Sequence, residues 1–159
     1  SNTVLLSEFW KKRQAVLVFV RHFGWIFCRQ QVAELAENVS RFERRDANLV
    51  VIGSGEPRYF EKFRKATGYN GNLFSDSSRE SFSILGFSNG ITGLISLKSV
   101  SKAFSALKKG HKQGAIQGDT LQLGGAVIID PADNIRFYYA GKKVGDHPAM
   151  DQLLSALDT

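Results

Sequence analysis

Runs of consecutive apolar residues alternate along the chain with segments in which apolar residues recur every three or four positions. The apolar runs at 15–20 and 49–52 and the largely apolar segment 121–130 are short and rich in β-branched residues, so each predicts a strand buried in a sheet. Shorter strands are predicted at 73–76 and at 135–139, the latter returning antiparallel after a Pro-Ala-Asp-Asn turn. The strands therefore belong to one sheet that helices cover.

Helical periodicity fills the intervals between these strands. From Ile26 one continuous helix is expected, whose inward positions are Cys28, Val32, Leu35, Ala36, Val39 and Phe42. A second helix has Pro57 in its first turn and ends at Gly68, and a short one covers 79–85. The last helix begins at Asp146-His147-Pro148, with Asp146 as its N-cap. This alternation of strands and helices predicts an α/β fold.

The length of 159 residues and the 43% hydrophobic content fit a single compact domain, 1–159. Between 87 and 118 the composition shifts to Gly, Ser and Lys, which predicts an insertion on the core fold. Inside it one amphipathic helix is expected at 99–109. We expect this helix to pack against the domain; a cap, a dimer contact or a lid are the alternatives.

Cys28 is the only cysteine, and it falls in the first turn of the predicted helix, at the carboxyl end of a predicted central strand. That edge is where α/β sheets place their chemistry. Backbone N–H groups at a helix start stabilise a thiolate, and Arg21 and Arg29 would add positive charge. Phe23 and Phe27 would instead favour the protonated thiol of Cys28, because apolar surroundings raise the pKa of a thiol.

The residues that lead up to this cysteine are Arg21-His22-Phe23-Gly24-Trp25-Ile26-Phe27-Cys28. They resemble the Arg-His-Phe-Gly-Cys-x-x-Cys motif of the peroxiredoxin-like branch of the alkyl hydroperoxide reductase/thiol-specific antioxidant (AhpC/TSA) family, except that Trp25 replaces the first cysteine. The segments 124–131 and 146–148 also resemble that family. The resemblance implies a thioredoxin-like fold: a central mixed β-sheet flanked by helices, with a helical insertion before the last β-hairpin.

The resemblance also implies a site. Cys28 falls on the peroxidatic cysteine of peroxiredoxins, and Arg21 is the second catalytic candidate. The expected substrate pocket consists of His22, Phe23, Gly24, Trp25, Phe27, Arg29, Gly124 and Gly125. Two departures concern this pocket: Trp25 stands where peroxiredoxins carry a threonine, and Gly124-Gly125 where they carry an arginine.

Two functional hypotheses follow. The first is a peroxiredoxin-like antioxidant enzyme that reduces peroxides through Cys28 alone, with an external thiol as reductant. The alternative is a catalytically degenerate thioredoxin-like module with a binding or regulatory role. Dithiol exchange within the chain is excluded, because it needs two cysteines and the chain has one.

Composition and charge limit the kinds of partner that this protein is expected to bind. The net charge of +6 is scattered along the chain without a recognised binding motif, which argues against nucleic acid. No apolar run reaches the length of a membrane span, and no histidine spacing suggests a metal site. We expect that the protein needs no cofactor and that its substrate is a small peroxide or disulfide. A homodimer is the assembly to test. The single cysteine fits a reducing compartment, by default the cytoplasm.

Overall fold

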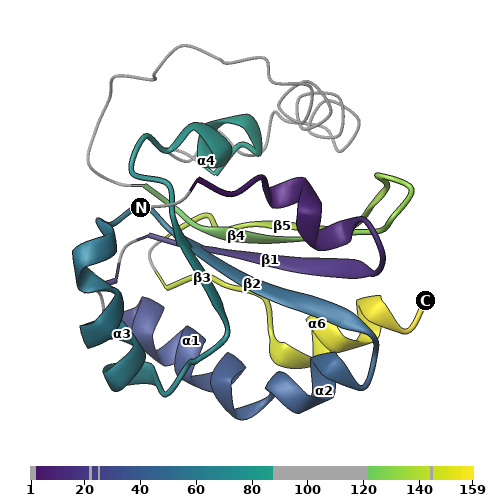
Figure 1. The fold of residues 1–159 in the computed structure, drawn as a ribbon, viewed down its shortest axis with the longest axis horizontal. Coiled ribbons are helices and arrows are strands. Elements are labelled where there is room, and N and C mark those ends of the chain that lie inside the picture. Colours follow the sequence, from purple (N-terminus) through teal and green to yellow (C-terminus); the bar gives the residue numbers. More distant parts are fainter. Residues whose placement is uncertain (1–2, 22, 25, 88–121, 144) are drawn as a thin grey trace.

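The computed structural model of the chain describes residues 3–21, 23–24, 26–87, 122–143 and 145–159. Their centre is one five-stranded sheet in the order β3-β2-β1-β4-β5 (Figure 1). Its strands are β1 (Gln14–Val20), β2 (Ala47–Gly53), β3 (Asn72–Ser75), β4 (Gly125–Ile129) and β5 (Ile135–Ala140). β1, β2 and β3 run parallel, while β4 is antiparallel to both β1 and β5. This confirms the predicted mixed sheet and its terminal hairpin.

Helices cover both faces of the sheet (Figure 1). One face carries α1 (Ile26–Glu37), α2 (Val39–Glu43), α3 (Phe60–Thr67) and α6 (Met150–Leu157), with the 3-10 helix η2 (Pro57–Tyr59) leading into α3. The other face carries the 3-10 helix η1 (Leu6–Trp10) and α4 (Glu80–Ile84). The predicted insertion at 87–118 and its helix at 99–109 lie outside the described residues from 88 onward, and both stay predictions.

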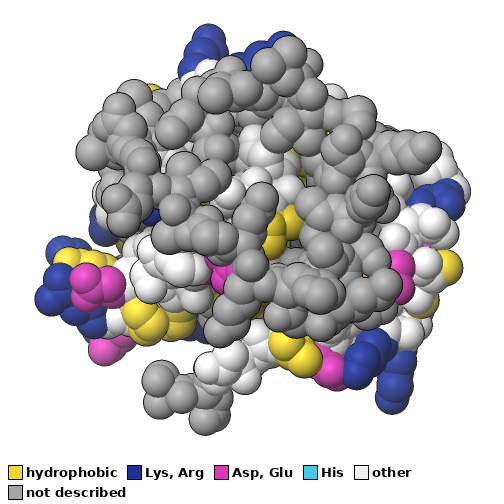
Figure 2. All heavy atoms as spheres, turned by 90° about the horizontal axis from the view of Figure 1, so that it is seen from above, with side chains coloured by type: hydrophobic (Ala, Val, Ile, Leu, Met, Phe, Trp, Pro, Cys, Tyr) yellow, Lys and Arg dark blue, Asp and Glu magenta, His cyan; other side chains and the backbone are white. Residues whose placement is uncertain are grey.

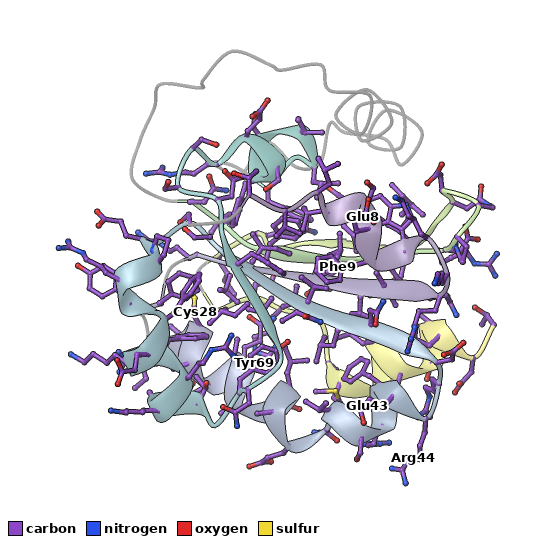
Figure 3. The ribbon with its side chains drawn as sticks, in the orientation of Figure 1. Glu8, Phe9, Cys28, Glu43, Arg44 and Tyr69 are labelled. Atoms are coloured by element: carbon purple, nitrogen blue, oxygen red, sulfur yellow. The ribbon has the colours of Figure 1, made fainter. Side chains whose placement is uncertain are left out.

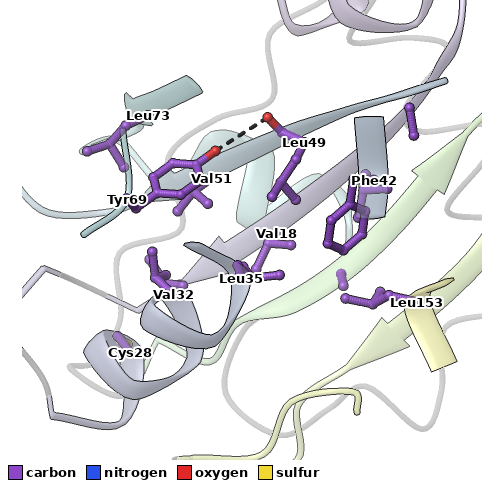
Figure 4. Close-up of a cluster of buried hydrophobic side chains, with 14 of the residues drawn as sticks. Val18, Cys28, Val32, Leu35, Phe42, Leu49, Val51, Tyr69, Leu73 and Leu153 are labelled. Atoms are coloured by element: carbon purple, nitrogen blue, oxygen red, sulfur yellow. Dashed lines mark hydrogen bonds between the residues drawn. The ribbon is translucent and has the colours of Figure 1, made fainter. Parts of the chain in front are cut away.

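The central strand β1 is buried on both faces, which explains its unbroken apolar sequence. Val16, Val18 and Val20 face the layer of α1, α2, α3 and α6, while Leu17 and Phe19 face the opposite layer. Figure 4 shows the first of these clusters, with Cys28 at its margin. Cys28 therefore packs against the same buried cluster that covers this face of β1, and this packing fixes its position.

Three predicted element boundaries are wrong. The continuous helix from 26 to 42 is interrupted at Asn38, whose side-chain amide donates to the Glu34 carbonyl oxygen at 2.8 Å and so competes with the helical backbone bond. β4 begins at Gly125 and not at 121. Asp146 does not cap the last helix: α6 begins at Met150, where Gln152 Oε1 accepts the Ala149 N–H at 2.8 Å.

Tyr69 is among the largest buried side chains of the described residues, with 1% of its surface exposed. Its hydroxyl lies 3.0 Å from the Asn72 carbonyl oxygen and 3.4 Å from the Leu49 carbonyl oxygen; Figure 4 draws the latter contact. Burial raises the pKa of Tyr69 well above its ordinary value of 10.0, and the nearby Arg64 charge offsets only part of that rise. The native state therefore holds the phenol in its neutral form.

This burial predicts a pH-dependent stability. Because the folded pKa is raised, the contribution of Tyr69 is present below pH 10.0 and is lost as the pH rises above that value, where the unfolded chain ionises first. Above it, the wild type should lose roughly 1.4 kcal/mol per pH unit more than Tyr69→Phe does. Urea unfolding across the alkaline range measures this, with Tyr59→Phe, an exposed phenol, as the matched control. Parallel pH curves for the wild type and Tyr69→Phe would contradict the prediction.

Surface charge is dispersed over the described residues. Figure 2 looks down on the face that carries α4, where Lys and Arg side chains are visible at several separate places around the rim. Several of these cations form exposed ion pairs with nearby acids, such as Lys11 with Glu8 and Lys65 with Glu61, each worth less than about 1 kcal/mol. Within the described part of the chain, no helix combines the length and apolar content that a membrane crossing requires.

Candidate functional site

A pocket of about 430 Å³, partly open to solvent, lies at the carboxyl end of β1. Four segments that are distant in sequence form its walls. They are the end of β1, the first turn of α1, the residues that enter β4, and the loop between β5 and α6. The lining residues are Phe19, Val20, Arg21, Phe27, Cys28, Gln31, Gln122, Leu123, Gly124, Gly125, Lys143, Gly145, Asp146 and His147.

Cys28 is the third residue of α1 and is 9% exposed (Figure 3). α1 is 12 residues long, and the amides of its first turn have no carbonyl partner within the helix. The positive end of the helix dipole therefore lies at the sulfur and favours the thiolate over the thiol. On the helix side Cys28 packs in the same cluster as Val32 and Leu35, so only a small part of the residue is open to a reactant.

The two arginines that the sequence singled out have different positions. Arg21 directly follows β1 and lines the pocket, and its carbonyl oxygen accepts hydrogen bonds from the backbone N–H and the hydroxyl of Ser54. Arg29 does not line the pocket. Its Nε donates to the Phe23 carbonyl oxygen at 3.2 Å, so this side chain fixes the loop that precedes α1.

Two aromatic residues that were expected in the pocket, Phe23 and Phe27, lie in different environments. Phe23 is 2% exposed and packs against the rings of Phe60 and Phe63, with centroid separations of 5.2 and 4.9 Å. It therefore belongs to the core and not to the pocket, since a buried ring lowers the free energy more than an exposed one. Phe27 does line the pocket, while Gly24 is exposed and does not. His22 and Trp25 lie outside the described residues.

Gly124 and Gly125 line the pocket as predicted, and the reason is steric. A Cβ atom on Gly124 would lie far inside van der Waals contact with the backbone oxygen of Phe19. On Gly125 it would overlap the Phe87 ring and the Tyr139 carbonyl oxygen. The arginine that the family resemblance implies for this place is thus incompatible with the backbone as it is folded.

The loop between β5 and α6 contributes a wall that the sequence prediction missed. Asp146 accepts hydrogen bonds from the Tyr139 hydroxyl at 2.5 Å and from the Lys142 backbone N–H at 2.9 Å. Gly145, at φ +84°, brings the loop backbone onto the Phe27 ring. The Asp146-His147-Pro148 motif was the available signal, but its interpretation as a helix start concealed its role in the pocket.

The hydrogen bond between Tyr139 and Asp146 shifts both groups. The bond from the Tyr139 hydroxyl, and then the one from the Lys142 amide, lower the pKa of Asp146. The same bond to Asp146 is the main cause that raises the pKa of Tyr139, and burial adds to it. Asp146 therefore stays ionised and anchored at neutral pH.

The described lining of this pocket combines one thiol with cationic and amide side chains. Within the described residues, no group of three or more His, Cys, Asp and Glu side chains is arranged to hold a metal ion. Arg21 and Lys143 supply positive charge, and Gln31 and Gln122 supply amide groups. The arrangement suits attack by sulfur on a small polar electrophile.

Together, the mixed sheet and the cysteine in the first turn of α1 define a thioredoxin-like protein. The family is narrower: over residues 34–143 the chain matches the family described as AhpC/TSA antioxidant enzyme, and it belongs to that family. The matched range begins after Cys28, so this match does not depend on the cysteine. The predicted family and fold are both confirmed.

Named relatives agree with this assignment. The chain is 30% identical over 164 residues to the Thioredoxin-like protein AAED1, chloroplastic, of Arabidopsis thaliana, covering 98% of this chain and 66% of that protein. It is 32% identical over 162 residues to Peroxiredoxin-like 2C of Mus musculus, covering 95% of this chain and 71% of that one. The chain therefore spans about two thirds of their length.

A solved structure supports the fold independently. Mycobacterium tuberculosis AhpC superposes with a TM-score of 0.67 over 99% of this chain and 74% of its own, at 19% sequence identity. At that identity the likeness concerns the fold alone.

Proposed function

We propose that this protein is a peroxiredoxin-like enzyme that reduces peroxides through Cys28 alone and draws its reducing equivalents from an external thiol. One observation carries the proposal: Cys28 lies in the first turn of α1, on the wall of a pocket that it shares with Arg21. Membership of the AhpC/TSA family supports it. The helix start and the arginine both favour the anionic form of the sulfur, which is the reactive one.

The proposed cycle has three steps. The Cys28 thiolate attacks one peroxide oxygen, a sulfur–oxygen bond forms as the oxygen–oxygen bond breaks, and the leaving oxygen takes a proton to become water or an alcohol. An external thiol then displaces water from the sulfenic acid to give a mixed disulfide. A second thiol releases Cys28 and leaves as the oxidised disulfide. The reductant must be external because the chain has no second cysteine.

Several expectations belong to this proposal. The substrate is a small peroxide or disulfide, and the assembly to test is a homodimer. The cytoplasmic location also stays a prediction, and the printed name of the Arabidopsis relative places that protein in the chloroplast.

Intact-protein mass spectrometry after a small excess of hydrogen peroxide tests the proposal. We expect one oxygen atom to be added to the wild type and to be removed again by a thiol, and we expect no thiol-reversible addition to Cys28→Ser. The single methionine, Met150, provides an internal control, because a sulfoxide there is not reversed by a simple thiol.

The low exposure of Cys28 favours one alternative, a catalytically degenerate module that binds or regulates a partner. Cys28 is only 9% exposed and belongs to the same buried cluster as Val32 and Leu35. A cysteine that serves only as a small buried hydrophobic residue has the same environment. A wild-type protein that stays unmodified while it remains folded would support this module and exclude the peroxidase.

A further inference from the structure

Reduction of a peroxide by a thiol needs a group that moves a proton, and this pocket lacks the side chains that peroxiredoxins are implied to use. Gly124 and Gly125 occupy the place of the arginine. Among the described lining residues, the side chains that carry an ionisable proton besides Cys28 are Arg21, Lys143, Asp146 and His147. Within the part of the pocket lining that the structure describes, the choice of a proton carrier therefore lies among these four.

Three of them are unsuited to the task. A guanidinium or ammonium group has no lone pair that could accept a proton, so Arg21 and Lys143 supply positive charge only. Asp146 accepts two hydrogen bonds, from the Tyr139 hydroxyl and the Lys142 amide, and these hold it ionised. Imidazole is the side chain that both accepts and releases a proton near neutrality, so His147 is the suitable group among these four described residues.

One contact of the His147 ring distinguishes its two nitrogens. Its Nδ1 lies 3.2 Å from the Pro148 carbonyl oxygen. A carbonyl oxygen only accepts, so Nδ1 must carry the hydrogen in this contact. In the neutral ring Nε2 is then the nitrogen with a free lone pair, and it is the one that can accept a proton.

Neighbouring residues hold His147 against the pocket. Asp146, directly before it, is tied to β5 through the Tyr139 hydroxyl, and the Gly141 N–H donates to the Gly124 carbonyl oxygen at 2.9 Å. The loop is thereby joined to the same segment before β4 that lines the Cys28 side of the pocket. Asp146 is a positioning residue in this arrangement, because its two hydrogen bonds fix the backbone next to His147.

We propose that His147 is the proton-transfer residue of the Cys28 reaction. Its Nε2 takes the thiol proton, which leaves the thiolate to attack the peroxide. As the oxygen–oxygen bond breaks, the imidazolium returns that proton to the departing oxygen, so the net step converts thiol and peroxide into sulfenic acid and water or alcohol. The inference rests on the proposed function and names the residue that carries its proton.

The test measures the rate of Cys28 oxidation by hydrogen peroxide between about pH 5 and pH 8, the interval in which imidazole changes charge. We expect His147→Gln to be slower than the wild type by roughly a hundredfold at neutral pH and to lose a titration step from its rate profile. Added imidazole should restore part of the rate in His147→Ala. Lys62→Gln, an exposed side chain on α3 outside the pocket lining, is the control and should keep the wild-type rate and profile.

The outcomes separate the two proposals. If the wild type adds no thiol-reversible oxygen at any pH, the proposed peroxidase itself is overturned. If the wild type reacts and His147→Gln reacts equally fast with the same profile, only the role of His147 is overturned. A slower variant with an unchanged pH profile and a lowered melting temperature would also overturn it, because a purely structural role has that pattern.

Discussion

Replacing Cys28 with serine is expected to abolish thiol-dependent peroxide consumption, lowering the rate by at least roughly a thousandfold. A serine hydroxyl stays protonated at neutral pH and has no oxidation state equivalent to a sulfenic acid, so neither the attack nor the reduction by an external thiol can proceed. Serine has nearly the shape of cysteine, which lets the pocket keep its walls. Loss of peroxide in the presence of dithiothreitol measures the effect.

The fold must be checked in the same sample, because Cys28 also packs against the core. Cys28→Ala, which removes the sulfur without adding a hydroxyl, provides a second variant for this purpose. Both should melt within a few degrees of the wild type, as about 1 kcal/mol shifts the melting temperature by roughly 2–4 °C at this chain length. A folded Cys28→Ser protein that kept a tenth of the wild-type rate would refute catalysis by Cys28.

The largest effect on stability is expected from Gly124→Ala. A Cβ at this position meets the backbone oxygen of Phe19 in the central strand β1, and a backbone atom inside a sheet cannot move aside as a side chain can. We expect a loss of about 3 kcal/mol in the free energy of unfolding, or a fall of roughly 6–12 °C in the melting temperature.

Gly68→Ala is the matched control for this glycine. Gly68 has φ +74° at the end of α3, and no atom lies within 4 Å of the place where its Cβ would be. Its cost is therefore conformational alone, about 1 kcal/mol. Thermal unfolding of both variants compares the steric cost at Gly124 with the conformational cost at Gly68. A Gly124→Ala protein at least as stable as Gly68→Ala would show that the segment before β4 can shift away from β1.

Local patterns were enough for much of the fold. The apolar run 15–20 and the run 49–52 mark β1 and β2, because a strand buried on both faces leaves no polar position. The change of periodicity at Ile26 locates the start of α1, and Cys28 with it. The prediction failed where a side chain competed with the helical backbone. The Asn38 side chain interrupts the helix predicted from 26 to 42, and the spacing of apolar residues carries no information about that hydrogen bond.

The sequence by itself thus determined the family, the sheet and the place of Cys28, the proposed nucleophile, at the start of a helix. Only the tertiary structure decided what surrounds that nucleophile, since the pocket walls come from segments more than 90 residues apart that meet when β4 pairs with β1. Spacing along the chain does not state which side of a loop faces inward. That is why Phe23 and Arg29, close to Cys28 in sequence, support the core and the loop, while His147, far from it in sequence, lies on the pocket wall.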